Sequence, residues 1–154
     1  MSLRFEKCGP LAPEGCEEFF HDSDIYTHYF EGRNLQRYLS RAAAAGELYV
    51  AYDEENRPIG VMKVAMRGFC GLYPYLNIIG VHAKNRGKGI GAFLMAELER
   101  MTLASGAKRV ALLVSDSNEA GQRFYERLGY WTLGVIPNAL NEGVNELVMI
   151  KDLA

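Results

Sequence analysis

One stretch decides the fold: residues 75–92, YLNIIGVHAKNRGKGIGA. Residues 75–81 are nearly all apolar, as expected for a central strand that is covered on both faces. Residues 90–105 carry apolar side chains at helical spacing and charged side chains between them. The alternation RGKGIG lies between these two segments. The stretch therefore predicts a buried strand, a tight glycine-rich turn and an amphipathic helix.

The glycine-rich turn has the features of an anion site. Gly87, Gly89 and Gly91 carry no Cβ, so the backbone can approach a ligand closely. The unpaired amides of the first helical turn and the helix dipole attract negative charge. Three positive side chains lie within five residues, at Lys84, Arg86 and Lys88. By itself the turn predicts a phosphate-binding site.

Two common phosphate-binding motifs fit this turn poorly. A Walker loop would need a glycine five positions before Gly87 and a Ser or Thr after Lys88, and the sequence has neither. A dinucleotide-binding fingerprint is formally satisfied by Gly87, Gly89 and Ala92. In that motif, however, the turn follows its strand directly, whereas here residues 82–86 intervene. The context therefore disfavours both ATP and NAD.

The flanking chain predicts a mixed α/β fold. Strand-like runs joined by a polar turn indicate an antiparallel hairpin before the central strand, and a strand that follows the helix crossover should run parallel to the central strand. The expected helices are residues 13–20, 34–45, 90–105 and 118–128. The expected strands are residues 48–52, 59–66, 75–81, 110–114, 130–136 and 145–151, with a turn-rich segment at 137–143. We expect one domain, residues 1–154, with a mostly antiparallel sheet around one parallel β-α-β unit.

Composition limits the partners that can be expected. The 154 residues are 49% apolar and 23% charged, with a net charge of −2, which is typical of a globular protein and argues against a nucleic-acid partner. Apolar runs are short, and the first residues lack a signal-peptide pattern, so we expect a cytoplasmic protein without a membrane partner. Three cysteines match neither a zinc site nor a redox pair, so no metal is expected.

A second constellation lies in residues 118–130, NEAGQRFYERLGY. Asn118 and Tyr125 are seven residues apart, which brings them to one face of a helix after two turns. On spacing alone, the simpler interpretation is a helix cap at Asn118 and a packed core side chain at Tyr125.

Together the two constellations resemble the GCN5-related N-acetyltransferase (GNAT) superfamily. Arg86-x-x-Gly89-x-Gly91 is similar to its R/Q-x-x-G-x-G/A signature, and residues 118–130 look like its second signature. The resemblance runs from about Leu48 to the C-terminus. It implies helices on both faces of a sheet that splays at a cofactor slot, and acetyl-CoA as co-substrate without a metal. The implied cofactor-binding residues are Ile79, Val81, Arg86, Gly87, Lys88, Gly89, Ile90, Gly91, Ala92, Asn118 and Tyr125.

The resemblance also implies a reaction, in which a primary amine attacks acetyl-CoA directly in a ternary complex. Tyr125 would protonate the departing thiolate, and the amide near Val81 would polarise the acetyl carbonyl. Gly80 is expected to mark a bulge that opens the slot. The acceptor would be a small molecule or a peptide, and the C-terminal strands would pair two copies into a homodimer. The alternatives are a CoA-binding sensor of the same fold without turnover, and a dinucleotide-binding protein.

The general base is not identified by the resemblance. Family members carry a glutamate on the central strand or on the following strand, where this chain has Tyr75 and Leu113. The sequence leaves five candidates for the base: Asp22, Asp24, His28, Glu31 and Tyr75. The acceptor is expected between the early helical region, with Tyr26, Tyr29 and Phe30, and the segment 137–143.

Overall fold

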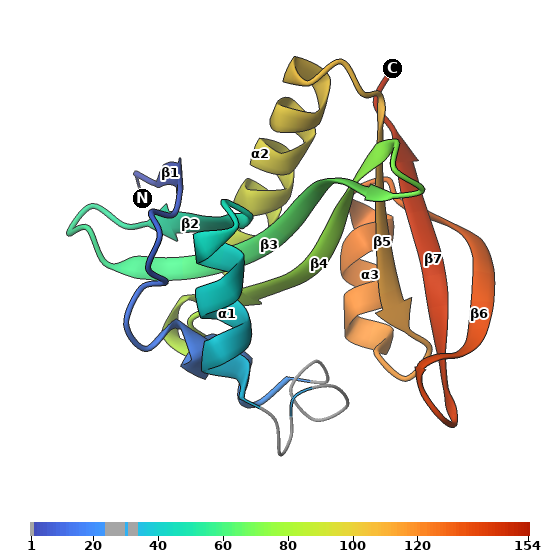
Figure 1. Cartoon of the computed structure of the whole chain (residues 1–154), viewed down its shortest axis with the longest axis horizontal. Helices are drawn as coiled ribbons and strands as arrows, with labels where there is room; N and C mark the ends of the chain where they lie inside the picture. Colours follow the sequence, from blue (N-terminus) through green and yellow to red (C-terminus); the bar gives the residue numbers. More distant parts are fainter. Residues whose placement is uncertain (1, 24–29, 31–33) are drawn as a thin grey trace.

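A computed structural model describes residues 2–23, 30 and 34–154, which form a seven-stranded sheet between helices (Figure 1). The strand order is β1-β2-β3-β4-β5-β7-β6, and all neighbours are antiparallel except β4 and β5. The strands are β1 (Arg4–Lys7), β2 (Leu48–Tyr52), β3 (Pro58–Phe69), β4 (Tyr73–Val81), β5 (Arg109–Ser115), β6 (Trp131–Asn141) and β7 (Val144–Asp152). The helices are α1 (Leu35–Ala44), α2 (Ile90–Ala104) and α3 (Glu119–Arg127), with short 3-10 turns η1 (Cys16–Phe20) and η3 (Ala83–Asn85).

Two apolar cores lie on opposite faces of the sheet. On one face, α2 and α3 bury Leu94, Leu98 and Tyr125 against β3, β4, β5 and β7. On the other face, α1 and η1 bury Leu39 and Phe20 against β2, β3 and β4. The expected fold class, with helices on both faces and a parallel pair at the centre, is confirmed.

The sheet extends further at both edges than the sequence pattern predicts. Strand β1 was not expected, because four residues with a single apolar side chain carry no clear strand signal; it pairs with β2, where Phe5 stacks on Tyr49. At the other edge, β6 continues to Asn141, so most of the predicted turn segment is strand. Register shifts within the β6–β7 pairing let the chain extend through these turn-type residues.

Strands β4 and β5 separate beyond their first pairs. Their pairing consists of Tyr75 with Ala111 and Leu76 with Leu112. The strands diverge towards the ends of β4 and β5, and Figure 1 shows the resulting opening between them. We call this opening the seam. Since a parallel sheet normally keeps its strands hydrogen-bonded along their length, the seam is a local departure from regular pairing.

The bulge that accompanies the seam lies at Asn77 and not at Gly80. Lys63 pairs with Ile78 and Val64 with Leu76, which leaves Asn77 as the extra residue of β4. Gly80 pairs regularly with Val61, so the expected bulge at Gly80 is wrong. A Cβ at Gly80 would lie 2.5 Å from the ring of Phe20. Glycine is therefore needed there for packing against η1.

Candidate active site

The glycine-rich turn forms one end of the site. Gly87 and Gly89 have φ angles of 75° and 82°, in the left-handed region that favours glycine, and a Cβ at either position would meet no atom within 4 Å. Gly89 is the N-cap of α2 and supplies no side-chain cap, so the first-turn amides of α2 are available to a ligand. A cavity of about 530 Å³ lies here, lined among others by Gly87, Gly89, Ile90, Gly91 and Ala92. The open space and the amides fit a pyrophosphate.

The basic side chains of the turn play different roles from one another. The Arg86 guanidinium donates to both carboxylate oxygens of Asp22, at 2.6 and 2.7 Å, and to the carbonyl oxygens of Phe19 and Val81, at 3.0 and 3.1 Å. Hydrogen bonding from Arg86 holds the pKa of the Asp22 carboxyl below its usual value. Lys88 is exposed. Arg86 thus fastens the turn to η1, and Asp22, a candidate base, is occupied by this pair.

The edge of β4 continues the site from the turn. The His82 amide donates to the Ile59 carbonyl on the β3 side at 2.8 Å. Because successive residues of a strand direct their backbone groups to alternate sides, those of Ile79 and Val81 point towards the seam. The Arg86 contact with the Val81 carbonyl agrees with this direction. The backbone of Ile79 and Val81 can therefore bond a ligand that lies in the seam.

Helix α3 contributes Asn118 and Tyr125 from the other side of the seam. The Asn118 Oδ1 accepts a hydrogen bond from the Gly121 amide at 2.9 Å, so this side chain caps the helix. Burial raises the pKa of the Tyr125 phenol, with a smaller contribution from Tyr75, so the phenol is protonated at neutral pH. Both residues line a second cavity of about 1030 Å³. Asn118 therefore caps α3 and lines the cavity at the same time.

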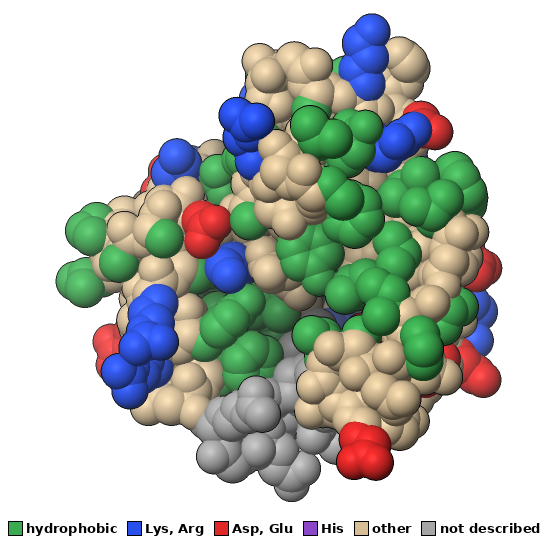
Figure 2. Space-filling view, turned by 45° about the vertical axis from the view of Figure 1, so that its right-hand side comes forward, with side chains coloured by type: hydrophobic (Ala, Val, Ile, Leu, Met, Phe, Trp, Pro, Cys, Tyr) green, Lys and Arg blue, Asp and Glu red, His purple; other side chains and the backbone are tan. Residues whose placement is uncertain are grey.

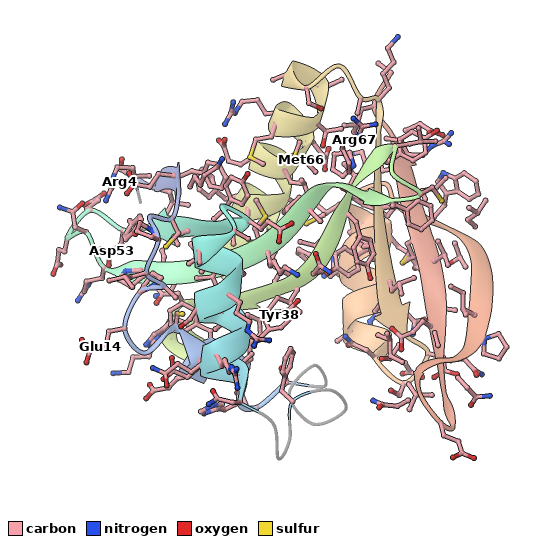
Figure 3. The ribbon with its side chains drawn as sticks, in the orientation of Figure 1. Arg4, Glu14, Tyr38, Asp53, Met66 and Arg67 are labelled. Carbon is pink, nitrogen blue, oxygen red and sulfur yellow. The ribbon has the colours of Figure 1, made fainter. Side chains whose placement is uncertain are left out.

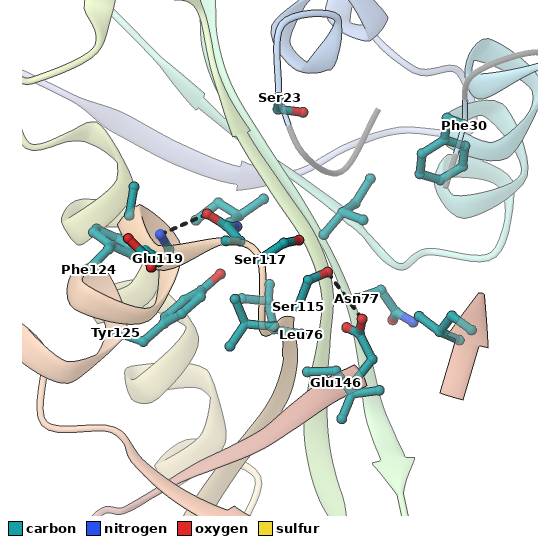
Figure 4. A pocket seen from close by; sticks show the side chains of 18 of the residues that line it. Ser23, Phe30, Leu76, Asn77, Ser115, Ser117, Glu119, Phe124, Tyr125 and Glu146 are labelled. Atoms are coloured by element: carbon teal, nitrogen blue, oxygen red, sulfur yellow. Dashed lines mark hydrogen bonds between the residues drawn. The ribbon is translucent and has the colours of Figure 1, made fainter. Parts of the chain in front are cut away.

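Sequence reasoning missed Glu146, a buried carboxylate of this larger cavity. Glu146 lies on β7 opposite Ser115 of β5, is 2% exposed, and accepts a hydrogen bond from the Ser115 hydroxyl at 3.1 Å (Figure 4). Burial, followed by the charge of Glu146, raises the pKa of Tyr75 to about 12. A glutamate at the start of the apolar run of β7 was the available signal. The resemblance implies a glutamate only on the central strand or the following strand, so it does not single out a carboxylate on β7.

The remaining wall of the larger cavity is aromatic and apolar. Phe30 and Tyr38 meet edge to face with ring centroids 4.9 Å apart, and Figure 3 shows Tyr38 projecting from α1 towards the seam. Leu140 of β6, within the segment 137–143, also lines the cavity. The other residues proposed for the acceptor side lie outside the described part of the chain: Asp24, Tyr26, His28, Tyr29 and Glu31.

Two features are absent from the described part of the chain, a metal-binding cluster and a membrane-spanning helix. Within residues 2–23, 30 and 34–154, no three His, Cys, Asp or Glu side chains gather in a way that could hold a metal ion. No helix in the same residues has the length and apolar character needed to cross a bilayer.

Comparison with known proteins identifies the family. Residues 14–130 match the profile of the Acetyltransferase (GNAT) family. An acetyltransferase of Pectobacterium atrosepticum is 31% identical over 90 residues, so the match spans 58% of this chain and 62% of that relative's length. A GNAT-family acetyltransferase from Desulfovibrio desulfuricans superposes with a TM-score of 0.77 at 16% identity, over 99% of this chain and 100% of its own. Arabidopsis thaliana Naa50, in complex with the bisubstrate analogue CoA-Ac-MVNAL, superposes with a TM-score of 0.68 at 24% identity, over 99% of each chain. The structural likenesses show the fold, and the profile match, which covers most of the chain, shows that it belongs to the Acetyltransferase (GNAT) family.

Proposed function

We propose that this protein is an acetyl-CoA-dependent N-acetyltransferase acting on a primary amine of a small molecule or a peptide. The observation that carries the proposal is the seam, which lies between the glycine-rich turn and Tyr125. The two cavities share Ser23, Ile79, Arg86 and Phe124 in their walls, so they adjoin along the seam. A long ligand can therefore place its phosphates at the turn and its reactive end beside Tyr125.

Each part of the site has a role in this reaction. Bound acetyl-CoA supplies an activated acetyl thioester. The first-turn amides of α2 hold the pyrophosphate, and the β4 backbone at Ile79 together with Asn118 orients the pantetheine arm. The Val81 amide, directed into the seam, polarises the acetyl carbonyl. Tyr125 donates its proton to the sulfur as the thiolate departs, because its phenol remains protonated at neutral pH.

Binding of the cofactor separates this function from a dinucleotide-binding protein. CoA and acetyl-CoA should raise the melting temperature in proportion to the logarithm of their concentration, whereas NAD should leave it unchanged. A shift with NAD and none with CoA would exclude the proposed cofactor.

Turnover separates an enzyme from a CoA-binding sensor, and Tyr125→Phe probes the proposed acid. We expect thiol release to fall about a hundredfold or more, with acetyl-CoA affinity nearly unchanged, because only the proton donor is removed. Tyr130→Phe is the matched control: Tyr130 is also buried, but its hydroxyl donates to Glu99 at 3.3 Å, away from both cavities. Equal turnover by Tyr125→Phe and Tyr130→Phe would show that Tyr125 is not the acid.

The proposed partner in assembly is a second copy of the chain. Strand β6 is an edge of the sheet, and its Trp131, Leu133 and Val135 are 47%, 56% and 53% exposed. Figure 2 shows apolar side chains gathered on the side of the molecule that carries β6 and β7. An apolar edge strand tends to pair with another strand, which supports a homodimer through β6. Light scattering after size exclusion should give twice the mass of one chain, and Val135→Lys should restore the monomer.

A further inference from the structure

Glu146 places a negative charge inside the larger cavity at the end of the β5–β7 ladder. Its side chain is 2% exposed, and the hydroxyl of Ser115, itself 4% exposed, donates to it. The other carboxylate among the described lining residues, Glu119, has a side chain that is 81% exposed to water. A buried carboxylate attracts a cation much more strongly than an exposed one, because solvent does not screen it.

Asn77 supplies a second acceptor from β4, on the other side of the seam. Its Oδ1 is buried and has no hydrogen-bond partner. Among the described residues, no other buried side-chain nitrogen or oxygen lacks a partner. The residue is the extra one in the β4 bulge and lines the same cavity as Glu146. Figure 4 shows both side chains in the cavity, drawn from β4 and β7. Since an acceptor without a donor costs free energy, a ligand N–H at this position would stabilise the site.

Aromatic rings line the same cavity, among them those of Phe30, Tyr38, Tyr75 and Tyr125. Burial, followed by the charge of Glu146, raises the pKa of Tyr75. The ammonium of Lys63 sits 4.9 Å from the centre of the Tyr38 ring. A second cation on the ligand at this wall would be repelled by Lys63.

We propose that Glu146 and Asn77 form the seat of the acceptor's ammonium group, and that the acceptor is a primary amine with one positive charge and an apolar or aromatic group beside it. This inference rests on the proposed acetyl transfer. The ammonium N–H groups bond the Glu146 carboxylate and the Asn77 Oδ1. The apolar group packs against Tyr38, Phe30 and Leu140. Polyamines and aminoglycosides, with several charges, fit this wall poorly.

Glu146 also receives the proton that must leave before the amine can react. One proton passes from the ammonium to the Glu146 carboxylate, which frees the lone pair on nitrogen. The N–C bond then forms and the C–S bond breaks. Tyr125 gives its phenol proton to the sulfur, and the second proton lost by the nitrogen restores the phenol of Tyr125. The sum is one N-acetylated amine, one thiol and one proton, which Glu146 releases to water.

Four amines and one pair of variants test the seat by activity. The probes are 2-phenylethylamine, phenylalanine amide, 1,4-diaminobutane and spermidine. Glu146→Gln is compared with Glu54→Gln, a control in the exposed turn between β2 and β3 that lines neither cavity. We expect kcat/KM for the first two amines to exceed that of the polyamines at least about tenfold. Glu146→Gln should lower kcat/KM about a hundredfold to ten-thousandfold, and Glu54→Gln should not change it. Acetylation that favours spermidine, or that is equal in Glu146→Gln and the wild type, would overturn the seat while leaving acetyl transfer intact.

The pH dependence gives a readout that a purely structural role of Glu146 would not produce. The loss in Glu146→Gln should shrink as the pH approaches the pKa of the amine, because solution then supplies the neutral nucleophile. Ser115 from β5 and Tyr75 from β4 face Glu146, and the pKa of Tyr75, about 12, keeps that phenol protonated throughout an assay between about pH 6 and 9. A loss that stays constant with pH would argue against proton transfer to Glu146.

A binding measurement without turnover tests the seat formed by Glu146 and Asn77 independently of the proposed acetyl transfer. With CoA bound, 2-phenylethylamine should raise the melting temperature of the wild type further, and Glu146→Gln and Asn77→Leu should each lose this second shift while keeping the shift with CoA. If acetyl-CoA binds and no amine is acetylated, the proposed acetyl transfer is wrong. The second shift in melting temperature then still shows whether Glu146 and Asn77 bind the amine. A second shift that is the same in all three proteins would overturn it.

Discussion

Replacing Asn77 by leucine should stabilise the fold and weaken the acceptor site together. The Oδ1 of Asn77 is buried without a hydrogen-bond donor, which costs about 1–3 kcal/mol in typical proteins. Leucine has a similar size and no polar atoms, so the substitution removes that cost. The side chain is only partly buried and faces the cavity, so little further gain is expected. We therefore expect the free energy of unfolding to rise by about 1 kcal/mol or more.

Urea unfolding followed by circular dichroism measures this change directly. A gain of about 1 kcal/mol corresponds to a rise in melting temperature of about 2–4 °C for a chain of this size. The control is Asn34→Leu, because the Oδ1 of Asn34 accepts a hydrogen bond from the Arg37 amide at 2.8 Å and caps α1. Losing that cap should cost about 1 kcal/mol, so the two variants should move in opposite directions.

The activity of Asn77→Leu completes the prediction. Losing one hydrogen bond to a charged ligand group, worth about 1.5–3 kcal/mol, should raise the KM for 2-phenylethylamine by about tenfold to a hundredfold. The affinity for acetyl-CoA should not change. If Asn77→Leu destabilises the protein as Asn34→Leu does, Asn77 serves the fold, and the reasoning that assigns its oxygen to a ligand is refuted.

Three further predictions concern the cofactor side. Gly89→Val should abolish binding of CoA, measured by calorimetry, because a branched side chain is strained at a φ of 82° and fills the open space of the turn; retained affinity would remove the pyrophosphate site. Gly80→Ala should lower the melting temperature, because its Cβ would approach the ring of Phe20 to 2.5 Å, and an unchanged value would show that η1 adapts freely. Asp22→Asn should lower stability slightly at neutral pH and salt-dependently, because the exposed pair with Arg86 is lost. The pKa of Asp22 in the folded protein lies below the ordinary value of 3.8. The stability that the wild type gains over Asp22→Asn is therefore complete above pH 3.8 and is lost as the pH falls through the folded pKa. Thermal unfolding at pH 7 and pH 3 should show a smaller difference between the two proteins at pH 3.

The part of the site that could be predicted from the sequence is the part built from consecutive residues. The strand, turn and helix of residues 75–104 can be predicted from local sequence alone. Alternating glycines and the spacing of apolar residues indicate them without information about the partner strands. Asn118 as a helix cap follows from its position before α3. These elements form the proposed cofactor side of the site.

The proposed acceptor side depends on registers between distant strands, which local sequence patterns do not contain. Glu146 enters the cavity because β7 pairs with β5 so that it faces Ser115. Asn77 is the extra residue of the bulge, where the register of β4 against β3 shifts by one residue. A slip of one residue would turn either side chain to the other face. Gly80 was misread for the same reason: its packing against Phe20 comes from a segment about sixty residues away in the sequence.

The most direct test of the account is the product formed from acetyl-CoA and a panel of small amines and peptides with free N-termini. We predict that mass spectrometry finds one N-acetyl group on the amine for each thiol released by the wild type, and far less of both with Tyr125→Phe. The contradicting result is a protein whose melting temperature rises with acetyl-CoA while no amine is acetylated and no thiol appears, because such a protein binds the cofactor across the seam without using it.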